Sequence, residues 1–169
     1  MSGALCISVD LELAWGFWDK PSPEQHRLCA EKERAIVAAL LDLLAEREIA
    51  ATWVIVGSLL DATAKPPVDT AFGRRIWYAP ELVEAIREAS PLQDVGSHGF
   101  AHLYFRQTDR ERLRADLQAA RRVHDAHGLD FTSFVFPRNQ IAHLDLLAEA
   151  GVRVFRGDDV GWFTTVRER

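Results

Sequence analysis

Five short apolar segments alternate with stretches of helical character, and this alternation is the feature that most limits the possible fold. The apolar segments cover residues 4–9, 50–56, 92–96, 131–136 and 152–155. Helices are expected between them, at residues 24–48, 80–88, 108–127 and 141–150. Residues 58–79 show no clear period and are expected to form a long connection. Strands that alternate with helices favour a parallel sheet or barrel, so the sequence predicts one α/β domain over residues 1–169 with about five parallel strands.

Polar side chains follow four of the five apolar segments. Asp10 and Glu12 come after the first segment, His98 after the third, Arg138 after the fourth and Asp158 after the fifth. Parallel α/β folds bind their ligands at the carboxyl ends of the strands. Coincidence is the alternative interpretation, because turns at the opposite edge also carry charged residues. The pattern predicts a functional site at one edge of the sheet.

Composition excludes several classes of protein. The chain has 169 residues, of which 48% are hydrophobic and 27% charged, and this suits a single packed domain. A net charge of −5 leaves no broad basic surface, so nucleic acid is not expected as a partner. The two cysteines have no CxxC spacing, and neither a signal peptide nor a membrane-spanning apolar run is evident. We therefore expect a cytoplasmic protein without membrane insertion; the sequence gives no indication of its oligomeric state.

Two histidines, His98 and His102, are spaced so that they can share one metal ion. If residues 99–102 form a helical turn, the two rings lie on one face, close enough to meet at a tetrahedral zinc. Chance or packing in the core explains the pair equally well. The helical metalloprotease motif requires glutamate directly after the first histidine, and this chain has Gly99 there. A further ligand and a base must therefore come from elsewhere in the chain.

Asp10 and Glu12 can supply both of these groups. Alternation along an extended chain places the two carboxylates on the same side. One carboxylate with two histidines would give zinc three protein ligands and leave a fourth position open, as in catalytic sites. The other carboxylate would then be free to act as a base. The alternative is that Asp10 caps a loop and Glu12 is solvated.

Four motifs resemble those of the polysaccharide deacetylase family, the NodB-homology carbohydrate esterases. They lie at residues 8–12, 98–102, 134–139 and 158–162. The resemblance implies a distorted, incomplete (β/α) barrel and a hydrolase that removes acetyl groups from N-acetylated sugars. It also implies a divalent metal, with zinc expected, bound by Glu12, His98 and His102, and Asp10 as the catalytic base. Glu12 takes the carboxylate ligand role because Leu11 stands where the family most often has a second aspartate.

Other segments suggest a branch of this family and a substrate pocket. Residues 135–140, together with the dipeptides at 15–16 and 156–157, resemble a branch found among surface-polysaccharide biosynthesis genes. Trp15, Phe136 and Trp162 are candidates for a pocket that stacks on a sugar or holds its acetyl group. The alternative for each aromatic side chain is simple packing in the core.

The chain also departs from the family pattern. Gly99 replaces a small hydroxylic residue, and Val135 fills the place of the arginine that orients the base. Arg138 is expected to take over that catalytic role, with a backbone N–H near it holding the oxyanion. The family's fifth motif, which brings a histidine general acid, has no counterpart before Arg169. We therefore expect a domain that lacks the C-terminal part of the family domain.

Two other functions remain open at this point. The chain could be a truncated or inactive domain that only binds carbohydrate or a partner, which the missing fifth motif favours. It could also be a metal-dependent amidohydrolase that acts on a small non-sugar amide.

Overall fold

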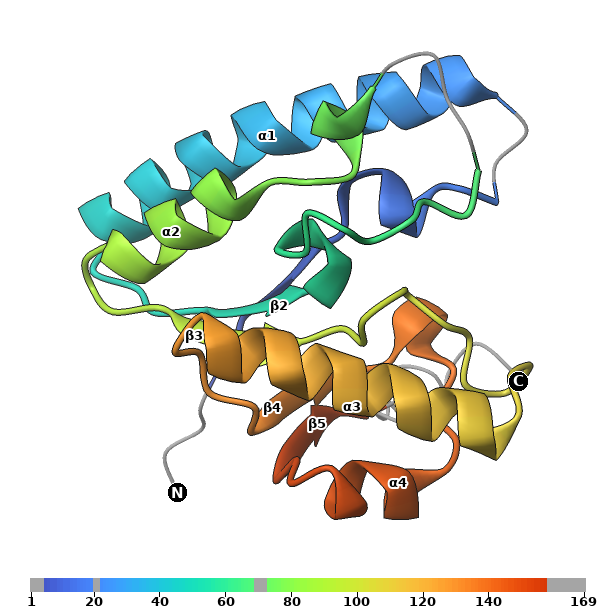
Figure 1. Cartoon of the computed structure of the whole chain (residues 1–169). Helices are drawn as coiled ribbons and strands as arrows, with labels where there is room; N and C mark the ends of the chain where they lie inside the picture. The colour runs from blue at the N-terminus through green and yellow to red at the C-terminus, as the bar shows by residue number, and fades with distance from the viewer. Residues whose placement is uncertain (1–4, 20–21, 69–72, 158–169) are drawn as a thin grey trace, which may run out of the picture.

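A computed structural model describes residues 5–19, 22–68 and 73–157, and it shows one five-stranded sheet curled into half a barrel (Figure 1). Every neighbouring pair of strands is parallel, in the order β1-β2-β3-β4-β5. The strands are β1 (Ser8–Leu11), β2 (Thr52–Ile55), β3 (Asp94–Ser97), β4 (Ser133–Val135) and β5 (Val154–Arg156). The predicted fold class and strand number are confirmed.

Four helices connect these strands and cover one side of the sheet. They are α1 (Pro23–Glu46), α2 (Pro80–Glu88), α3 (Arg110–Ala126) and α4 (Leu144–Glu149). Helices α1 and α2 each begin with proline, which the first helical turn tolerates because its N–H groups have no partner within the helix. The cap of α3 is Asp109, whose carboxylate accepts the N–H of Arg112 at 2.9 Å. The helix therefore begins at Arg110, two residues after the predicted start at residue 108.

Two separate apolar clusters lie beneath the helices. The first packs against α1 and α2 and includes Trp53, Leu59, Trp77 and Ile86. The second packs against α3 and α4 and includes Phe105, Leu113, Leu117, Phe134 and Leu146. Figure 1 shows the same division, with α1 and α2 together at the top and α3 and α4 together below. Each large side chain that is fully buried contributes roughly 1.5–3 kcal/mol, so these clusters fix the two halves of the sheet.

The register of the sheet determines which side chains meet at its carboxyl edge. Leu11, Ile55, Ser97 and Phe134 are aligned across β1 to β4. Successive side chains point to opposite faces of a sheet, so residues one position before or after this row lie on the other face. Strand β1 continues through Leu11, so Asp10 lies inside the strand and does not follow it as predicted. Asp10 and the two residues after the row, Glu12 and His98, thus share the face opposite the helices.

Short 3₁₀ turns follow several strands at this edge. They are η1 (Leu13–Gly16), η2 (Gly57–Leu59) and η4 (Pro137–Asn139), and a further turn, η3 (Arg74–Ile76), lies in the long connection after β2. Among the described residues, six that are not glycine have positive φ. Four of these six lie in segments at the carboxyl edge: Leu13, His102, Arg138 and Asn139. Such strained residues persist only where the surrounding structure holds them, and they are frequent at functional sites.

Candidate metal centre

Glu12, His98 and His102 meet at one point on the inner face of the half-barrel. Glu12 Oε1 lies 2.8 Å from His98 Nε2 and 3.1 Å from His102 Nε2. One ligand atom from each residue lies within 4.8 Å of the others, and both histidines are buried. The spacing of the histidines predicted that one carboxylate would join them, and the family resemblance pointed to Glu12 as that carboxylate. These three side chains do lie together in the structure.

The hydrogen bonds of His98 fix which of its nitrogens faces Glu12. Its Nδ1 lies 2.8 Å from the carbonyl oxygen of Val135, and a carbonyl can only accept, so Nδ1 carries the proton. In neutral His98 the lone pair of Nε2 therefore points at the Glu12 carboxylate, which is also an acceptor. Two acceptors at 2.8 Å require a proton or a cation between them. A divalent metal satisfies this requirement for both imidazoles and the carboxylate together.

Charges at the cluster also fit a metal. Burial raises the pKa of Glu12, but the short contacts with the His102 and His98 rings outweigh burial and hold this pKa well below its usual value. Burial is the largest influence on His102 and lowers its pKa, which favours the neutral imidazole. Two neutral imidazoles and one carboxylate are a donor set that zinc takes in catalytic sites. The residues present therefore fit a divalent ion.

Two residues around Glu12 hold it in place. A Cβ atom on Gly16 would lie 1.6 Å from Glu12 Oε2, so the Glu12 side chain lies directly over the glycine backbone. Glu33, from α1, accepts the backbone N–H of Glu12 at 2.7 Å. Burial raises the pKa of Glu33 to about 7. Any side chain larger than hydrogen at position 16 would displace the carboxylate from the two histidines.

The loop of residues 98–102, hereafter the histidine loop, is not helical. Gly99 has φ +79° and His102 has φ +54°, both outside the right-handed helical region. The helical turn that would place both rings on one face is therefore not formed, but the rings still come together, with centroids 5.0 Å apart. Non-helical backbone achieves this because neighbouring segments hold the loop from both sides.

Asp10 is paired with Arg156 at the end of β5. The guanidinium donates to both carboxylate oxygens, from Nη1 at 2.8 Å and from Nη2 at 2.7 Å. Arg156 also donates to Ser8 Oγ at 3.0 Å and to Asn139 Oδ1 at 3.3 Å. A planar guanidinium in this two-pronged arrangement fixes the direction of the carboxylate.

Arg138, which we expected to orient Asp10, makes different contacts. Its Nη2 donates to the carbonyl oxygen of Gly16 at 2.8 Å and to Asp19 Oδ1 at 2.9 Å. This corrects the expected role of the Arg138 side chain, since Arg156 makes the contact with Asp10. The physical reason is the curl of the sheet, which brings β5 back toward β1.

Two of the three residues proposed for an aromatic pocket, Trp15 and Phe136, are buried elsewhere. Trp15 is 2% exposed, and its indole N–H donates to the carbonyl oxygen of Trp77 in the first core. Phe136 is 1% exposed and packs against Phe105 and Phe134 in the second core. Both are core residues, which was the alternative interpretation. Trp162 and the predicted Asp158 lie outside the described residues.

Sequence reasoning missed three contributors to the site. Arg156 was noted as part of a motif but given no role, although an arginine at a strand end on the same edge as Asp10 was a usable signal. Gly16 was noted only as a neighbour of Trp15. Asp116, in the middle of α3, accepts two backbone N–H groups of the histidine loop. It gave no signal, because a single acid on a charged helix resembles a surface residue.

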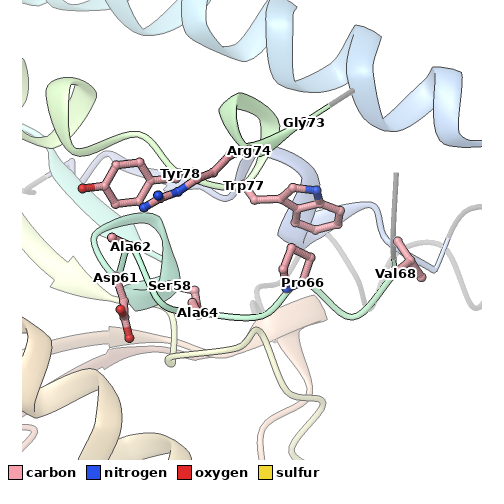
Figure 2. Close-up of a pocket in the computed structure, with 10 residues that line it drawn as sticks. All are labelled: Ser58, Asp61, Ala62, Ala64, Pro66, Val68, Gly73, Arg74, Trp77 and Tyr78. Carbon is pink, nitrogen blue, oxygen red and sulfur yellow. The ribbon is translucent and has the colours of Figure 1, made fainter. Parts of the chain in front are cut away.

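A cavity beside the metal cluster is lined by other residues. Figure 2 shows this cavity of about 430 Å³ beside the long connection after β2, where Trp77 and Pro66 lie on one side and Arg74 and Tyr78 on another. Ser58 lines this cavity and also hydrogen-bonds to Phe100 of the histidine loop. The residues that line this cavity do not include Glu12, His98 or His102. The metal cluster is thus a buried contact among side chains, next to the cavity but separate from it.

Comparison with known proteins shows the family of the chain. A model of the polysaccharide deacetylase family matches residues 25–155. The comparison with curated proteins found no matching sequence. Within the described residues, no helix has the length and apolar character needed to cross a bilayer.

Solved structures show the same fold. A family 4 carbohydrate esterase from Streptomyces lividans, in complex with acetate, is 16% identical with a TM-score of 0.59, and the match covers 92% of this chain and 63% of the esterase. A family 4 pseudoenzyme from Bacillus anthracis, BA3943, is 13% identical with a TM-score of 0.60. This match covers 89% of this chain and 41% of the pseudoenzyme. A mutant of the peptidoglycan deacetylase PdaC from Bacillus subtilis is 16% identical with a TM-score of 0.57. This match covers 90% of this chain and 57% of PdaC. The chain thus spans about two fifths to three fifths of the length of these structures.

Proposed function

The chain belongs to the polysaccharide deacetylase family, and from this premise we propose that it is a metal-dependent hydrolase that removes acetyl groups from N-acetylated sugars. The single observation that supports the proposal best is the meeting of Glu12, His98 and His102, with Asp10 in the strand that ends just before Glu12. Together these residues offer three metal ligands and a separate carboxylate.

Glu12, His98 and His102 would hold the metal, and zinc suits two imidazoles and one carboxylate. When bound there, a divalent ion supplies Lewis-acid polarisation of an amide carbonyl and of water. The Val135 carbonyl fixes the tautomer of His98, so that Nε2 stays available as a ligand. The buried position of both rings excludes water from the ligand side of the site.

Asp10 would accept the proton of the attacking water as a general base. Arg156 holds both of its oxygens and so fixes the carboxylate in one direction. Water then adds to the amide carbon, the C–N bond breaks, and acetate and a free amino sugar result. The leaving nitrogen requires one proton, and the proton taken up by Asp10 is sufficient to balance the reaction. A backbone N–H near Arg138 would stabilise the oxyanion.

Metal content and acetate release test this proposal together. Wild-type protein reconstituted with zinc is expected to hold one ion per chain and to release acetate from a member of a panel of N-acetylhexosamine oligomers. His98→Ala and Glu12→Gln should lose both properties, because each removes a ligand. His127→Ala, which removes an exposed histidine from the end of α3, is the matched control. Equal zinc content in wild type and His98→Ala would contradict the proposed metal site.

A second candidate is an inactive domain that binds carbohydrate without turnover. One observation favours it: a similar structure, BA3943, is itself a pseudoenzyme. In that case zinc would bind to the wild type, and carbohydrate binding would be measurable by calorimetry, but no substrate of the panel would release acetate. Acetate release that disappears in His98→Ala would exclude this candidate.

A further inference from the structure

Asp116 is a buried acid on α3 that touches neither a ligand atom nor Asp10, yet it binds the histidine loop. Its side chain is 6% exposed. Oδ2 accepts the backbone N–H of Phe100 at 2.8 Å, and Oδ1 accepts that of Ala101 at 2.9 Å. Both carboxylate oxygens thus accept backbone N–H groups from residues that lie between His98 and His102 in the chain. A Cβ atom on Gly99 would lie 2.9 Å from Oδ2, so the acid also packs against the loop backbone.

The opposite side of the loop is held by η2. The N–H of Gly57 donates to the carbonyl oxygen of Gly99 at 2.9 Å. Ser58 donates to the carbonyl oxygen of Phe100 twice, from its backbone N–H at 3.0 Å and from Oγ at 2.6 Å. Ser58 is 1% exposed. In the middle of the loop, the N–H groups of Phe100 and Ala101 therefore point to α3, and the carbonyl groups of Gly99 and Phe100 point to η2.

The two histidines depend on these contacts to different degrees. His98 is anchored independently, because its backbone N–H donates to Ile55 at 2.8 Å and its ring to Val135. The ring of His102 has only Glu12 as a polar partner: its buried Nδ1 has no hydrogen-bond partner among the described residues. The position of His102 is therefore set by the path of the loop before it.

We propose that Asp116, with Ser58 opposite it, is a positioning residue for the metal centre, and that it acts by placing His102 at bonding distance from an ion already held by His98 and Glu12. This inference rests on the proposed metal site. A buried carboxylate is costly, and burial raises the pKa of Asp116 to about 6, against the effect of the two N–H donors. If Asp116 served only to stabilise the fold, it would still have to accept these two N–H groups. Its replacement would then not be expected to affect His102 alone.

Titration with Zn²⁺ and Co²⁺ alone tests the proposal on the full chain. Asp116→Asn keeps the shape of the side chain but removes one of its two acceptors. We expect its affinity for Zn²⁺, measured by chelator competition, to fall by the roughly 10- to 100-fold typical of lost outer-shell partners. The visible spectrum of the Co²⁺ form should change, because one imidazole ligand is misplaced. In NMR spectra of the metal-free protein, the His102 ring signals should shift or broaden, whereas those of His98 stay in place.

The control is Asp125→Asn, which makes the same change of charge on an exposed residue of the same helix. It should bind both ions as the wild type does. If Asp116→Asn does not fold, as judged by circular dichroism, Ser58→Ala takes its place, with an expected loss of severalfold from the other side of the loop. Wild-type-like affinity and spectrum in a folded Asp116→Asn protein, or in Ser58→Ala where that replaces it, would overturn the inference but leave the metal site intact. A wild-type protein that binds neither ion would overturn both.

Discussion

The histidine loop and the Asp10–Arg156 pair lie at the same edge of the sheet, but the fold holds them in different ways. His98 and His102 are 0% and 1% exposed, and backbone groups of β2, β4 and η2 and the Asp116 carboxylate fix their loop. The side chains of Asp10 and Arg156 are 28% and 34% exposed, and two side chains hold each other. One half of the site is built into the core, and the other is a single ion pair at its rim.

Because of this difference, the two halves of the site suit different tasks. A buried loop with fixed backbone contacts suits ligands, because the ring nitrogens are in place before an ion arrives. A partly exposed carboxylate suits proton exchange, because it can reach both water and substrate. We therefore expect changes in the loop to affect metal binding and stability together, and changes in the pair to affect turnover alone.

The largest effect is expected at Asp10. Asp10→Asn should lower turnover by roughly 10²- to 10⁴-fold, as for other lost general bases. Zinc content should remain that of the wild type, because Glu12 and the histidines are untouched. Acetate release and elemental analysis of the same sample measure the two quantities. If Asp10→Asn loses its zinc and Glu12→Gln keeps both zinc and turnover, Asp10 is the ligand and the division between loop and pair is wrong.

A smaller effect is expected at Arg156. Arg156→Lys keeps the charge but cannot form two parallel hydrogen bonds with Asp10. Loss of one charge-assisted hydrogen bond costs roughly 1.5–3 kcal/mol, which corresponds to about 10- to 100-fold in turnover. The matched control is Arg153→Lys, an exposed arginine just before β5. Equal turnover in the two variants would show that Asp10 does not need the arginine.

Much of the fold could be predicted, because the spacing of apolar residues within a short segment indicates which of its faces is buried. The helix at Pro80–Glu88 was predicted to the residue, since proline at its start and the apolar spacing of Leu82, Val83 and Ile86 define it. Strand ends were less accurate. Strand β1 was predicted to end before Asp10, because a charged residue normally ends a buried strand. Here the face of the sheet opposite the helices accommodates the acid, and periodicity contains no information about that face.

The candidate site likewise has parts that local sequence could predict and parts that only the tertiary structure reveals. The meeting of His98 and His102 with a carboxylate after the first strand could be predicted, because the histidine spacing and the rule for strand ends are both local. The choice of Glu12 rather than Asp10 came from the family resemblance. Arg156 could not be assigned to Asp10, since their meeting depends on how far the sheet curls. Trp15 and Phe136 were assigned to the wrong place because an aromatic side chain near a strand end is equally suited to a core. Asp116 could not be recognised, since only the tertiary structure brings α3 to the histidine loop.

Gly99 offers a way to measure how tightly the histidine loop is held. Its φ of +79° disfavours alanine, and a Cβ there would lie 2.9 Å from Asp116 Oδ2. Gly99→Ala should therefore destabilise the protein by roughly 3 kcal/mol, as measured by urea unfolding. Gly128→Ala is the control, with φ +65° and no atom within 4 Å of the added Cβ, so it reports the cost of the backbone alone, about 1 kcal/mol. Equal losses in the free energy of unfolding would mean that the contact between the added Cβ and Asp116 does not contribute to the destabilisation.

The smallest expected effect concerns the pH dependence of the same loop. The pKa of Asp116 is about 6 in the folded protein, against an ordinary 3.8 in the unfolded chain, because burial disfavours the charged form. Between these two values the unfolded chain has already lost the proton that the folded protein keeps. The stability that protonated Asp116 contributes is thus complete below about pH 4 and lost as the pH rises through 6. Asp116→Asn has no such proton.

Urea unfolding of both metal-free proteins from pH 4 to 7 measures this contribution. The free energy of unfolding of the wild type, relative to that of Asp116→Asn, should fall by about 2 kcal/mol over this range. A difference that stays constant would mean that the two N–H donors of the loop fully offset burial, so that Asp116 is ionised throughout. A difference that rises with pH would mean that the donors outweigh burial. The histidine loop would then be held by a carboxylate as firmly paired as Asp10 is with Arg156, and the contrast between the two halves of the site would be one of exposure alone.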